Sequence, residues 1–373
     1  MKIMFFLPHA DDGIIRSTIP IIEGFNDKGY VTEVVTLQTK GRMTDQLDIV
    51  SKVHRINASR TFFAIHKFSQ HLRTNKPDIV ISAQHFANIS ALLAKVLSRQ
   101  NIRLIFTERT SIQYSLEQIH WFKRFITKLL IKNLYTFADS VVANSDGVKK
   151  ELIRFLGVEE TTVKLIYNPT FDSKVYKNDP VTKSVHPWFG IPNVPVILGV
   201  GRLSLEKNFT LLIKAFSLLN KNTRAKLIIL GDGPEKQSLT NLIKTLNIEE
   251  DCQLLGHVNN PYDFMKLSSL LVLSSNYEGL PNVLIEGQAC KIPVISTDCP
   301  HGPSEILLDG KAGSLTPMND YVTMSSKMFE ILSNPKIAEA YVKTASENLY
   351  RFQPKLALDK YDLILKKVNQ KEN

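Results

Sequence analysis

The chain has 373 residues, 43% of them hydrophobic, and a formal net charge of +10 at pH 7. This length favours two domains with sizeable cores, and three cysteines without metal-ligand spacing argue against a disulfide framework. No apolar run approaches the ~18 residues of a membrane-spanning helix, and residues 1–8 are too short for a secretory signal. We therefore expect a cytoplasmic protein, either soluble or held peripherally at the inner face of the cytoplasmic membrane.

The positive charge is concentrated in the first half of the chain. Residues 1–170 contain 23 Lys/Arg and 15 Asp/Glu, whereas residues 171–373 contain 23 and 21. A basic first half favours an anionic partner, such as lipid headgroups, nucleic acid or a phosphorylated acceptor. A basic surface that only keeps the protein soluble explains the same count.

Residues 1–170 alternate short β-rich runs with helical patterns, for example at 14–29 and 87–99. This alternation predicts a parallel sheet with covering helices. The expected strands are residues 2–7, 31–37, 79–82, 103–107 and 140–143.

Polar residues follow two of these strands. After the first strand, Gly13 permits a close backbone approach, and Arg16 lies within the first turn of the next helix. Glu108 and Arg109 end a later strand, at the sheet edge where open α/β folds bind their ligands. We take Arg16, Glu108 and Arg109 as candidates for ligand contact in this domain, although an isolated Glu–Arg pair is commonly a structural salt bridge.

Residues 120–132 mix aromatic and basic side chains at helical spacing. This pattern is similar to that of an interfacial helix seated on anionic lipid. A core-packed helix with a basic outer face has the same pattern, so both interpretations stay open.

Residues 171–195 contain four prolines and little periodicity, which predicts a linker. A second alternation follows, with strands expected at 196–200, 226–230, 253–255, 270–273 and 293–296. The predicted fold class is therefore α/β, with two Rossmann-like domains at residues 1–170 and 196–351. The amphipathic C-terminal segment, residues 352–373, is expected to pack back on the first domain. We expect ligands in a central cleft that both parallel sheets face.

Residues 199–204 (GVGRLS) follow a strand and lead into a helix. They form an incomplete dinucleotide fingerprint, because Ser204 replaces the last small residue. Asp232 follows the next strand, where a dinucleotide fold places its ribose-binding carboxylate. NAD binding and a purely structural turn are therefore alternatives. Arg202 and Lys207, two cations just after the glycine turn, favour a diphosphate.

Two further turns are expected at the same rim of the second sheet. Residues 231–234 form a tight turn after their strand, and residues 255–258 end the next strand. Residues 231–234 alone are more commonly only a turn. Both segments, the second with His257 and Val258, are nevertheless placed to wall a base pocket through backbone contacts.

The most informative segment is residues 274–286, SSNYEGLPNVLIE. Glu278 lies on a strand-to-helix loop, Pro281 lies in the first turn of the helix, and Glu286 lies one to two turns further on. Free N–H groups at residues 279–282 would point at an anion. Since the carboxylates repel phosphate, they most simply bind sugar hydroxyls. A nucleotide-sugar meets both demands.

Several common motifs are missing from the sequence. It has no Asp-x-Asp triplet, no glycine-rich loop ending in Gly-Lys-Ser/Thr and no His-Glu-x-x-His. Metal-chelated nucleotide-sugar binding and ATP hydrolysis therefore lose support, and we expect no metal and no cofactor. We also expect no nucleic-acid partner, because no stripe of basic and aromatic residues has a recognised spacing.

These segments resemble glycosyltransferase family 4, the retaining enzymes of the GT-B fold, over nearly the whole chain. Glu278 to Glu286 fits that family's Glu-x7-Glu motif, and Gly201-Arg202 with Lys207 fits its diphosphate-binding segment. Residues 299–306 are similar to the bacterial branch that builds surface polysaccharides such as O-antigen, capsule and exopolysaccharide.

The resemblance implies transfer of a hexose or N-acetylhexosamine from a UDP-sugar to a glycan acceptor on polyprenyl diphosphate. It implies that Glu278 holds hydroxyls of the donor sugar and that Glu286 holds the ribose. Arg202 and Lys207 would meet the charge on the departing diphosphate. The other implied donor-binding residues are Gly13, Gly201, Asp232, His257, Val258, Gly279, Leu280, Pro281 and Asn282. Arg16, Glu108 and Arg109 would lie on the acceptor side.

Two other functions stay open at this point. A nucleotide-sugar epimerase on the same fold would need acid and base groups, for which Glu108 and His301 are the candidates. A non-catalytic nucleotide-binding module would also fit the basic first half.

Overall fold

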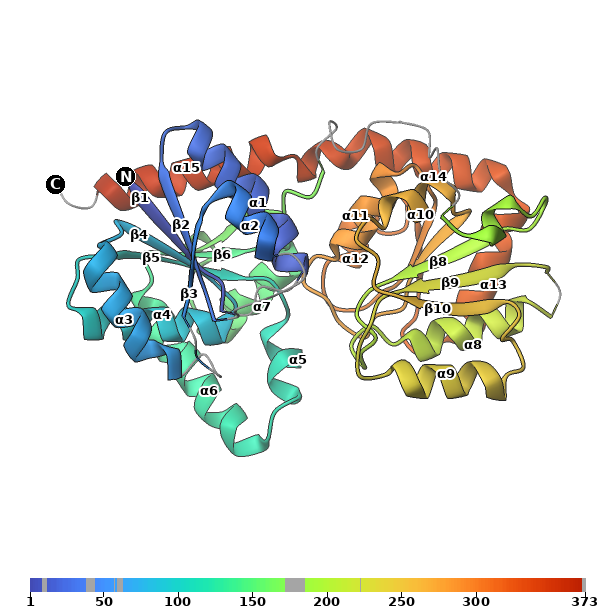
Figure 1. Ribbon diagram of the computed structural model, residues 1–373, viewed down its shortest axis with the longest axis horizontal. Helices are drawn as coiled ribbons and strands as arrows, with labels where there is room; N and C mark the ends of the chain where they lie inside the picture. Colours follow the sequence, from blue (N-terminus) through green and yellow to red (C-terminus); the bar gives the residue numbers. More distant parts are fainter. Residues whose placement is uncertain are drawn as a thin grey trace. The chain divides into compact units, whose positions relative to one another are not determined.

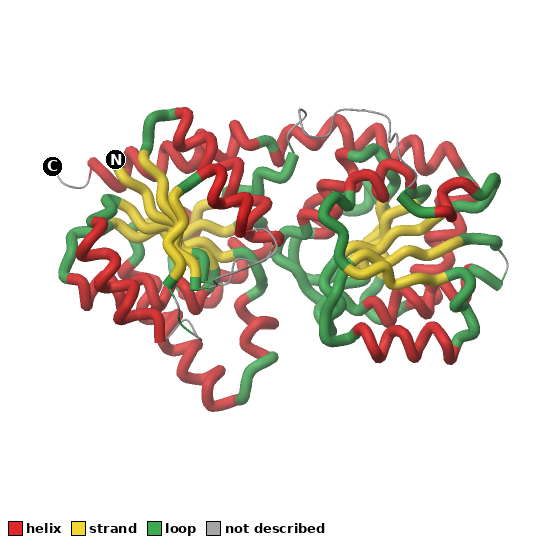
Figure 2. Tube along the Cα trace, in the orientation of Figure 1, coloured by secondary structure: helices red, strands yellow, loops and turns green. Residues whose placement is uncertain are grey.

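The computed structural model describes residues 1–8, 12–37, 44–56, 58, 63–171, 185–221 and 223–370, with only the backbone described at residues 12 and 44. The chain forms two compact units, Met1–Thr170 with Phe352–Asn373, and Phe171–Arg351. In each unit, helices cover both faces of one parallel sheet (Figures 1 and 2). The predicted fold class, two Rossmann-like α/β domains, is confirmed. Most of the predicted linker, residues 172–184, lies outside the described residues.

In the described residues, the first unit contains a seven-stranded sheet in the order β3-β2-β1-β4-β5-β6-β7. Five of these strands coincide with the apolar runs of the sequence. The edge strands β3 and β7 were not expected, because they are short and carry charged side chains (KVHR and VKL). The strands are β1 (Lys2–Phe6), β2 (Val31–Thr36), β3 (Lys52–Arg55), β4 (Ile79–Ala83), β5 (Arg103–Glu108), β6 (Ser140–Ala143) and β7 (Val163–Leu165).

Two helical layers cover this sheet, each with its own core. One layer comprises α3 (Ala64–Asn75), α4 (His85–Ser98), α5 (Ile112–Glu117), α6 (Trp121–Leu134) and α7 (Asp146–Leu156). The other comprises α1 (Asp12–Asp27), α2 (Thr44–Val50) and the C-terminal helix α15 (Pro354–Gln370). Gly24 lets α15 approach α1 closely, because a Cβ at Gly24 would lie 2.1 Å from a methyl carbon of Leu358.

The second unit contains a six-stranded sheet, within the described part of the chain, in the order β10-β9-β8-β11-β12-β13. Its strands are β8 (Val196–Val200), β9 (Lys226–Leu230), β10 (Cys252–Gly256), β11 (Leu270–Leu273), β12 (Val294–Thr297) and β13 (Ser314–Thr316). Its helices are α8 (Phe209–Leu219), α9 (Lys236–Thr245), α10 (Tyr262–Leu267), α11 (Asn282–Ala289), α12 (Pro303–Ile306), α13 (Tyr321–Ser333) and α14 (Pro335–Asn348). One core joins α8, α9 and α13 to the sheet.

Both sheets reverse their strand order beside the first strand of the unit. In the first unit β1 pairs with β2 and with β4, and in the second unit β8 pairs with β9 and with β11. The connections on the two sides of such a strand leave in opposite directions, so a crevice opens at its carboxyl end. In the second unit, the loops that follow β8 and β11 therefore meet at one place.

Candidate functional site

The glycine turn after β8 is held against the turn after β9 by backbone contacts. Gly201 N–H donates to Leu230 O at 3.0 Å, and Leu203 N–H donates to Asp232 O at 3.0 Å. Gly231 has a φ of 148°, and a Cβ on it would lie 1.8 Å from Gly201 O. A side chain at Gly231 would therefore separate the two loops. The sequence predicted a turn at residues 231–234, and the structure shows that the turn sets the position of the glycine loop.

Lys207 and Glu278 form an ion pair across this crevice. Lys207 comes from the loop after β8 and Glu278 from the loop after β11, and the Lys207 Nζ–Glu278 Oε1 distance is 2.6 Å. The hydroxyl of Ser275 donates to the same oxygen at 2.6 Å. Burial alone would lower the pKa of Lys207, but the carboxylates of Glu278 and Glu206 outweigh it and hold that pKa above its usual value. Lys207 is therefore charged at neutral pH.

Polar side chains join the loops that carry these two residues. Ser274 Oγ donates to Lys207 O at 2.9 Å, and Asn276 Nδ2 donates to Leu205 O at 2.8 Å. Asn208 Nδ2 in turn donates to Asn276 Oδ1 at 3.0 Å. These bonds fix the position of the ion pair before any ligand arrives, which is the preorganisation that electrostatic catalysis requires.

The start of α11 lies directly after Glu278. Its N-cap residue is Pro281, which, in this described segment, makes no side-chain capping bond. The loop after β12 packs against this start, since Glu278 N–H donates to Pro300 O at 2.6 Å and a Cβ on Gly302 would lie 2.7 Å from Gly279 O. Backbone N–H groups at the first turn of a helix favour an anion. The structure thus brings the predicted residues Gly279, Leu280, Pro281 and Asn282 to the ion pair.

Glu286 lies in the second turn of α11 and is buried. Its Oε1 accepts a hydrogen bond from the hydroxyl of Tyr262 at 3.3 Å. Tyr262 begins α10 and was not singled out from the sequence, because a lone tyrosine 24 positions away gives no local signal.

The remaining predicted residues of this unit lie around the same rim. Arg202 is exposed at the glycine turn, and His257 and Val258 are half-buried after β10. Asp232 accepts a hydrogen bond from Gly233 N–H at 2.9 Å, so its carboxylate takes part in its own turn. That use of the carboxylate weakens the NAD alternative, which assigned Asp232 to a ribose.

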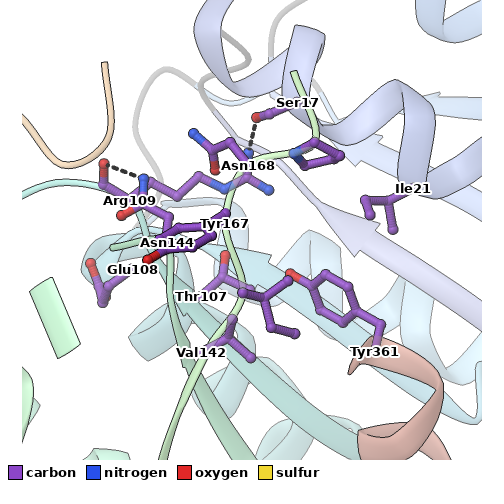
Figure 3. Close-up of a pocket in the computed structure, with 12 residues that line it drawn as sticks. Ser17, Ile21, Thr107, Glu108, Arg109, Val142, Asn144, Tyr167, Asn168 and Tyr361 are labelled. Atoms are coloured by element: carbon purple, nitrogen blue, oxygen red, sulfur yellow. Dashed lines mark hydrogen bonds between the residues drawn. The ribbon is translucent and has the colours of Figure 1, made fainter. Parts of the chain in front are cut away.

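In the first unit, a pocket opens at the carboxyl ends of β5 and β6 (Figure 3). Arg109 extends across it toward α1, where its guanidinium donates to Ile14 O at 3.3 Å and to Thr18 Oγ1 at 3.2 Å and bonds Ser17 Oγ. Asn144 donates to Arg109 O at 3.2 Å, and Tyr361 of α15 also lines the pocket. Arg16 is half-buried on α1, and Gly13 is exposed in its first turn.

Glu108 corrects one prediction. Its side chain is 0% exposed, with Asn88 Nδ2 donating to Oε1 at 2.8 Å and the hydroxyl of Tyr135 donating to the same oxygen. Within the described residues its Oε2 has no hydrogen-bond partner. Burial raises the pKa of Glu108 to about 8, although the bonds from Tyr135 and Asn88 act the other way. Although Glu108 is one of the residues that line the pocket in Figure 3, its carboxyl is buried against these partners, so it offers no exposed group to an acceptor and no exposed acid or base for the epimerase alternative.

Comparison with known proteins identifies the family. Residues 12–171 match the model described as Glycosyltransferase Family 4, and residues 187–348 match the model described as Glycosyl transferases group 1. A Campylobacter jejuni protein is 32% identical over 281 residues, covering 74% of this chain and 73% of the relative. It is named N-acetylgalactosamine-N,N'-diacetylbacillosaminyl-diphospho-undecaprenol 4-alpha-N-acetylgalactosaminyltransferase. The chain belongs to glycosyltransferase family 4.

Further matches agree with this family. The amylovoran biosynthesis glycosyltransferase AmsD of Erwinia amylovora is 26% identical over 314 residues, covering 84% of each chain. Among solved structures, Anabaena HepE in complex with UDP and glucose has a TM-score of 0.84 at 20% identity, covering 98% of this chain and 100% of that one. This likeness identifies the two-unit architecture as the GT-B fold.

For this glycosyltransferase, sequence reasoning found the charged groups but missed their supports. Ser274, Ser275 and Asn276 directly precede Glu278 in the sequence and anchor both its loop and its carboxylate. A run of small polar residues directly after a buried strand is the signal that could have identified them. None of the described helices is long and apolar enough to cross a membrane.

Proposed function

We propose that this glycosyltransferase moves a hexose or an N-acetylhexosamine from a UDP-sugar to a glycan on polyprenyl diphosphate, with retention of anomeric configuration. We place this reaction in the biosynthesis of a cell-surface polysaccharide. The observation that carries the proposal is the Lys207–Glu278 pair, 2.6 Å apart where the loops after β8 and β11 meet, directly before the start of α11. The names of the Campylobacter and Erwinia relatives support the choice of acceptor and pathway.

The donor would be held by the second unit. The diphosphate would lie at the first turn of α11 and against Arg202, because helix N–H groups and a guanidinium both favour an anion. Glu278 repels the phosphates and would instead accept hydroxyls of the transferred sugar, while Glu286 would accept those of the ribose. Lys207 carries a fixed positive charge beside the breaking bond, where it would stabilise the departing UDP. No step of this scheme requires a metal ion.

The acceptor would be bound by the first unit. Arg109 and the amides of Asn144 and Asn168 line the pocket in Figure 3 and offer donors to sugar hydroxyls or to a phosphate. The net charge of residues 1–170 is positive, so an acceptor that carries a diphosphate would be attracted to this unit.

Helix α6 carries exposed apolar side chains, which support the proposal that the acceptor is bound to a lipid. With about 100° of turn per residue, Trp121, Phe125 and Leu129 fall on one arc of α6, and they are 65%, 59% and 47% exposed. Thr127 and Ile131 alone are buried on this helix, on the opposite side. The α5–α6 pair extends away from the sheet of its unit (Figure 1), so this apolar arc is open.

Basic residues lie at the edge of the apolar arc of α6 and within it. By the same helical spacing, Lys128 lies at one edge of the arc, beside Trp121, and Lys132 lies between Trp121 and Phe125. Lys123 lies on another side of the helix, about 120° beyond Leu129. Lysines at the edge of the arc or within it can extend to lipid phosphates while the aromatic side chains enter the interface. We therefore propose that α6 lies on an anionic bilayer and not in the protein core.

The transfer reaction can be tested with a panel of UDP-sugars, each with and without a polyprenyl-diphosphate glycan. We expect UDP release that depends on the acceptor and a product with the anomeric configuration of the donor, measured by NMR. Change of the sugar without acceptor would instead indicate an epimerase. UDP binding without turnover on any pair would indicate a binding module.

Flotation with vesicles tests the role of α6 separately. The protein should float with anionic vesicles and much less with zwitterionic ones, and a Trp121→Glu/Phe125→Glu variant should lose flotation. Leu363→Glu on α15 is the matched control, because Leu363 is 59% exposed outside α6. Equal flotation of the double variant and the parent protein would show that α6 is not the contact.

A further inference from the structure

A cluster of three metal-binding side chains lies in the first unit, away from the strand ends described above. It comprises Glu33 on β2, His54 on β3 and His71 on α3. One ligand atom from each residue lies within 4.8 Å of the other two. Glu33 is the third of six residues of β2, and His54 on β3 pairs with Val35, so the cluster lies beside the middle of these two strands, while the predicted transfer residues follow strand carboxyl ends.

We infer that Glu33, His54 and His71 form a Zn²⁺ site that fastens the edge strand β3 and helix α3 to the sheet. Two imidazoles and one carboxylate are a known zinc ligand set, in which water completes the tetrahedron. Neither the sequence motifs nor the family match assigns any role to these residues, whose spacing of 21 and 17 positions forms no local motif.

The geometry needs only small side-chain rotations to accept the ion. His54 Nε2 and Glu33 Oε2 are 3.2 Å apart, which is near the separation of two ligands about 2 Å from a shared tetrahedral Zn²⁺. The rings of His54 and His71 have centroids 4.3 Å apart and an interplanar angle of 63°, so their nitrogens can turn toward one point. Asn75 Nδ2 lies 3.2 Å from both ring nitrogens of His71 and donates to His71 O at 3.0 Å, so it contacts the ring without selecting the nitrogen that would bind the ion.

Burial on one side favours a fixed site over a loose surface cluster. The side chain of Glu33 is 8% exposed and that of His54 is 19% exposed. Glu33 shares its sheet face with Val35 and Leu37, which pack in the core beneath α3. The three ligands come from three elements, so an ion bound to them would cross-link β2, β3 and α3, and β3 is a four-residue edge strand.

One neighbouring cation opposes the metal. Lys2 Nζ lies 3.0 Å from Glu33 Oε1 and also donates to Asn75 O at 3.0 Å. It occupies the oxygen of Glu33 that faces away from His54, so Oε2 is the one directed at the cluster. The Lys2 ammonium lowers the affinity for a divalent cation through charge repulsion. Removing this charge should therefore tighten metal binding, whereas it would not affect adventitious binding elsewhere.

Calorimetry on the metal-free full-length protein tests the site, with ZnCl₂ as titrant and MgCl₂ as the control ion. We expect one Zn²⁺ per chain, a higher melting temperature with Zn²⁺ and no response to Mg²⁺. His71→Ala should weaken Zn²⁺ binding at least about tenfold, and Lys2→Gln should strengthen it severalfold. His66→Ala is the matched control, because His66 is exposed on the same helix.

Two results would overturn the inference. One is absence of Zn²⁺ binding by the parent protein. The other is equal Zn²⁺ affinity in the parent, His71→Ala and His54→Ala proteins, which would place the metal at another position. The melting temperature of each variant without metal shows whether it is folded, so a folding defect is not mistaken for a lost ligand. Binding of UDP should be the same with and without Zn²⁺, which separates this test from that of sugar transfer.

Discussion

Glu278 and Glu108 occupy comparable places in the two units and have opposite electrostatic surroundings. Each follows or ends a buried strand of a parallel sheet, and each is buried. Glu278 bonds Lys207 Nζ at 2.6 Å, whereas Glu108 bonds the neutral groups of Asn88 and Tyr135. Burial without a cation favours the protonated acid, and burial with a cation favours the charged pair. The position of a residue at the end of a strand therefore sets where its carboxyl lies, while the groups that bond the carboxyl determine whether the charged or the protonated form is favoured.

The functional consequence differs between the units. In the proposed reaction, the ammonium of Lys207 in the second unit would stabilise negative charge that develops on the leaving diphosphate. A protonated Glu108 offers no such charge, so it serves the packing of β4, β5 and α4 around Asn88. Asn88 on α4 connects the two strands. Its Oδ1 accepts a hydrogen bond from Ser82 Oγ on β4 at 2.6 Å, and its Nδ2 donates to Glu108 Oε1 on β5 at 2.8 Å.

The Lys207→Met substitution should have the largest effect on the difference between the two carboxyls. It removes the ammonium that bonds Glu278, so that Glu278 loses the cation that Glu108 lacks. Leaving a buried carboxylate without its partner costs about 3–5 kcal/mol, and we expect loss of transfer activity by more than about 100-fold. Urea unfolding and initial rates of UDP release measure the two effects. Lys214→Ala is the control, since Lys214 is exposed on α8. Normal activity in a folded Lys207→Met protein would exclude Lys207 from the reaction.

Arg202→Ala removes a cation of the same site without leaving a buried carboxylate unpaired. Arg202 is exposed, so stability should change by less than about 0.5 kcal/mol. Transfer should nevertheless slow on the order of 100-fold, as when a single charge-stabilising donor is removed from an active site. Arg224→Ala, at another exposed arginine, should leave kcat unchanged. An unchanged kcat in Arg202→Ala would assign the diphosphate to Lys207 and α11 alone.

The sequence predicted the charged residues of the second unit because they lie in short motifs at strand ends. It could not predict that Lys207 pairs with Glu278, since the two are 71 positions apart and meet only through the strand order β9-β8-β11. It also placed Glu108 correctly at the end of a strand but missed its burial. That burial depends on Asn88 and Tyr135, which lie 20 and 27 positions away on other elements. Similarly, β3 and β7 gain their strand form from pairing with β2 and β6.

Glu286→Gln sharpens the comparison, because Glu286 is a second buried carboxyl of the second unit, and its Oε1 accepts a hydrogen bond from the hydroxyl of Tyr262. If it accepts ribose hydroxyls as an anion, the neutral amide should weaken UDP binding about tenfold, which is the worth of one charge-assisted bond. Tyr262→Phe should weaken UDP binding less, since it only releases the carboxylate. Calorimetric titration with UDP measures both. Unchanged UDP affinity in the Glu286→Gln protein would show that Glu286 does not bind the ribose.

The Glu108→Gln substitution should have the smallest effect, and its effect is on stability. It replaces the buried carboxyl that is protonated at neutral pH with a group that does not titrate. The pKa of Glu108 is raised from 4.5 to about 8 in the folded protein, so the folded state keeps a proton that the unfolded state releases between these values. The contribution of Glu108 to stability is thus complete below pH 4.5 and declines as the pH rises through about 8. Glutamine does not titrate. The free energy of unfolding of the Glu108→Gln protein, relative to that of the parent, should therefore increase by about 1–3 kcal/mol from pH 5 to pH 8.5.

Urea unfolding of both proteins at several pH values measures this difference. Exposed Glu117 supplies the control Glu117→Gln, whose stability should follow that of the parent at every pH. Parallel pH profiles for Glu108→Gln and the parent would mean that Glu108 is charged in the folded protein, and that a strand-end carboxyl can stay ionised there without the cation that Glu278 has.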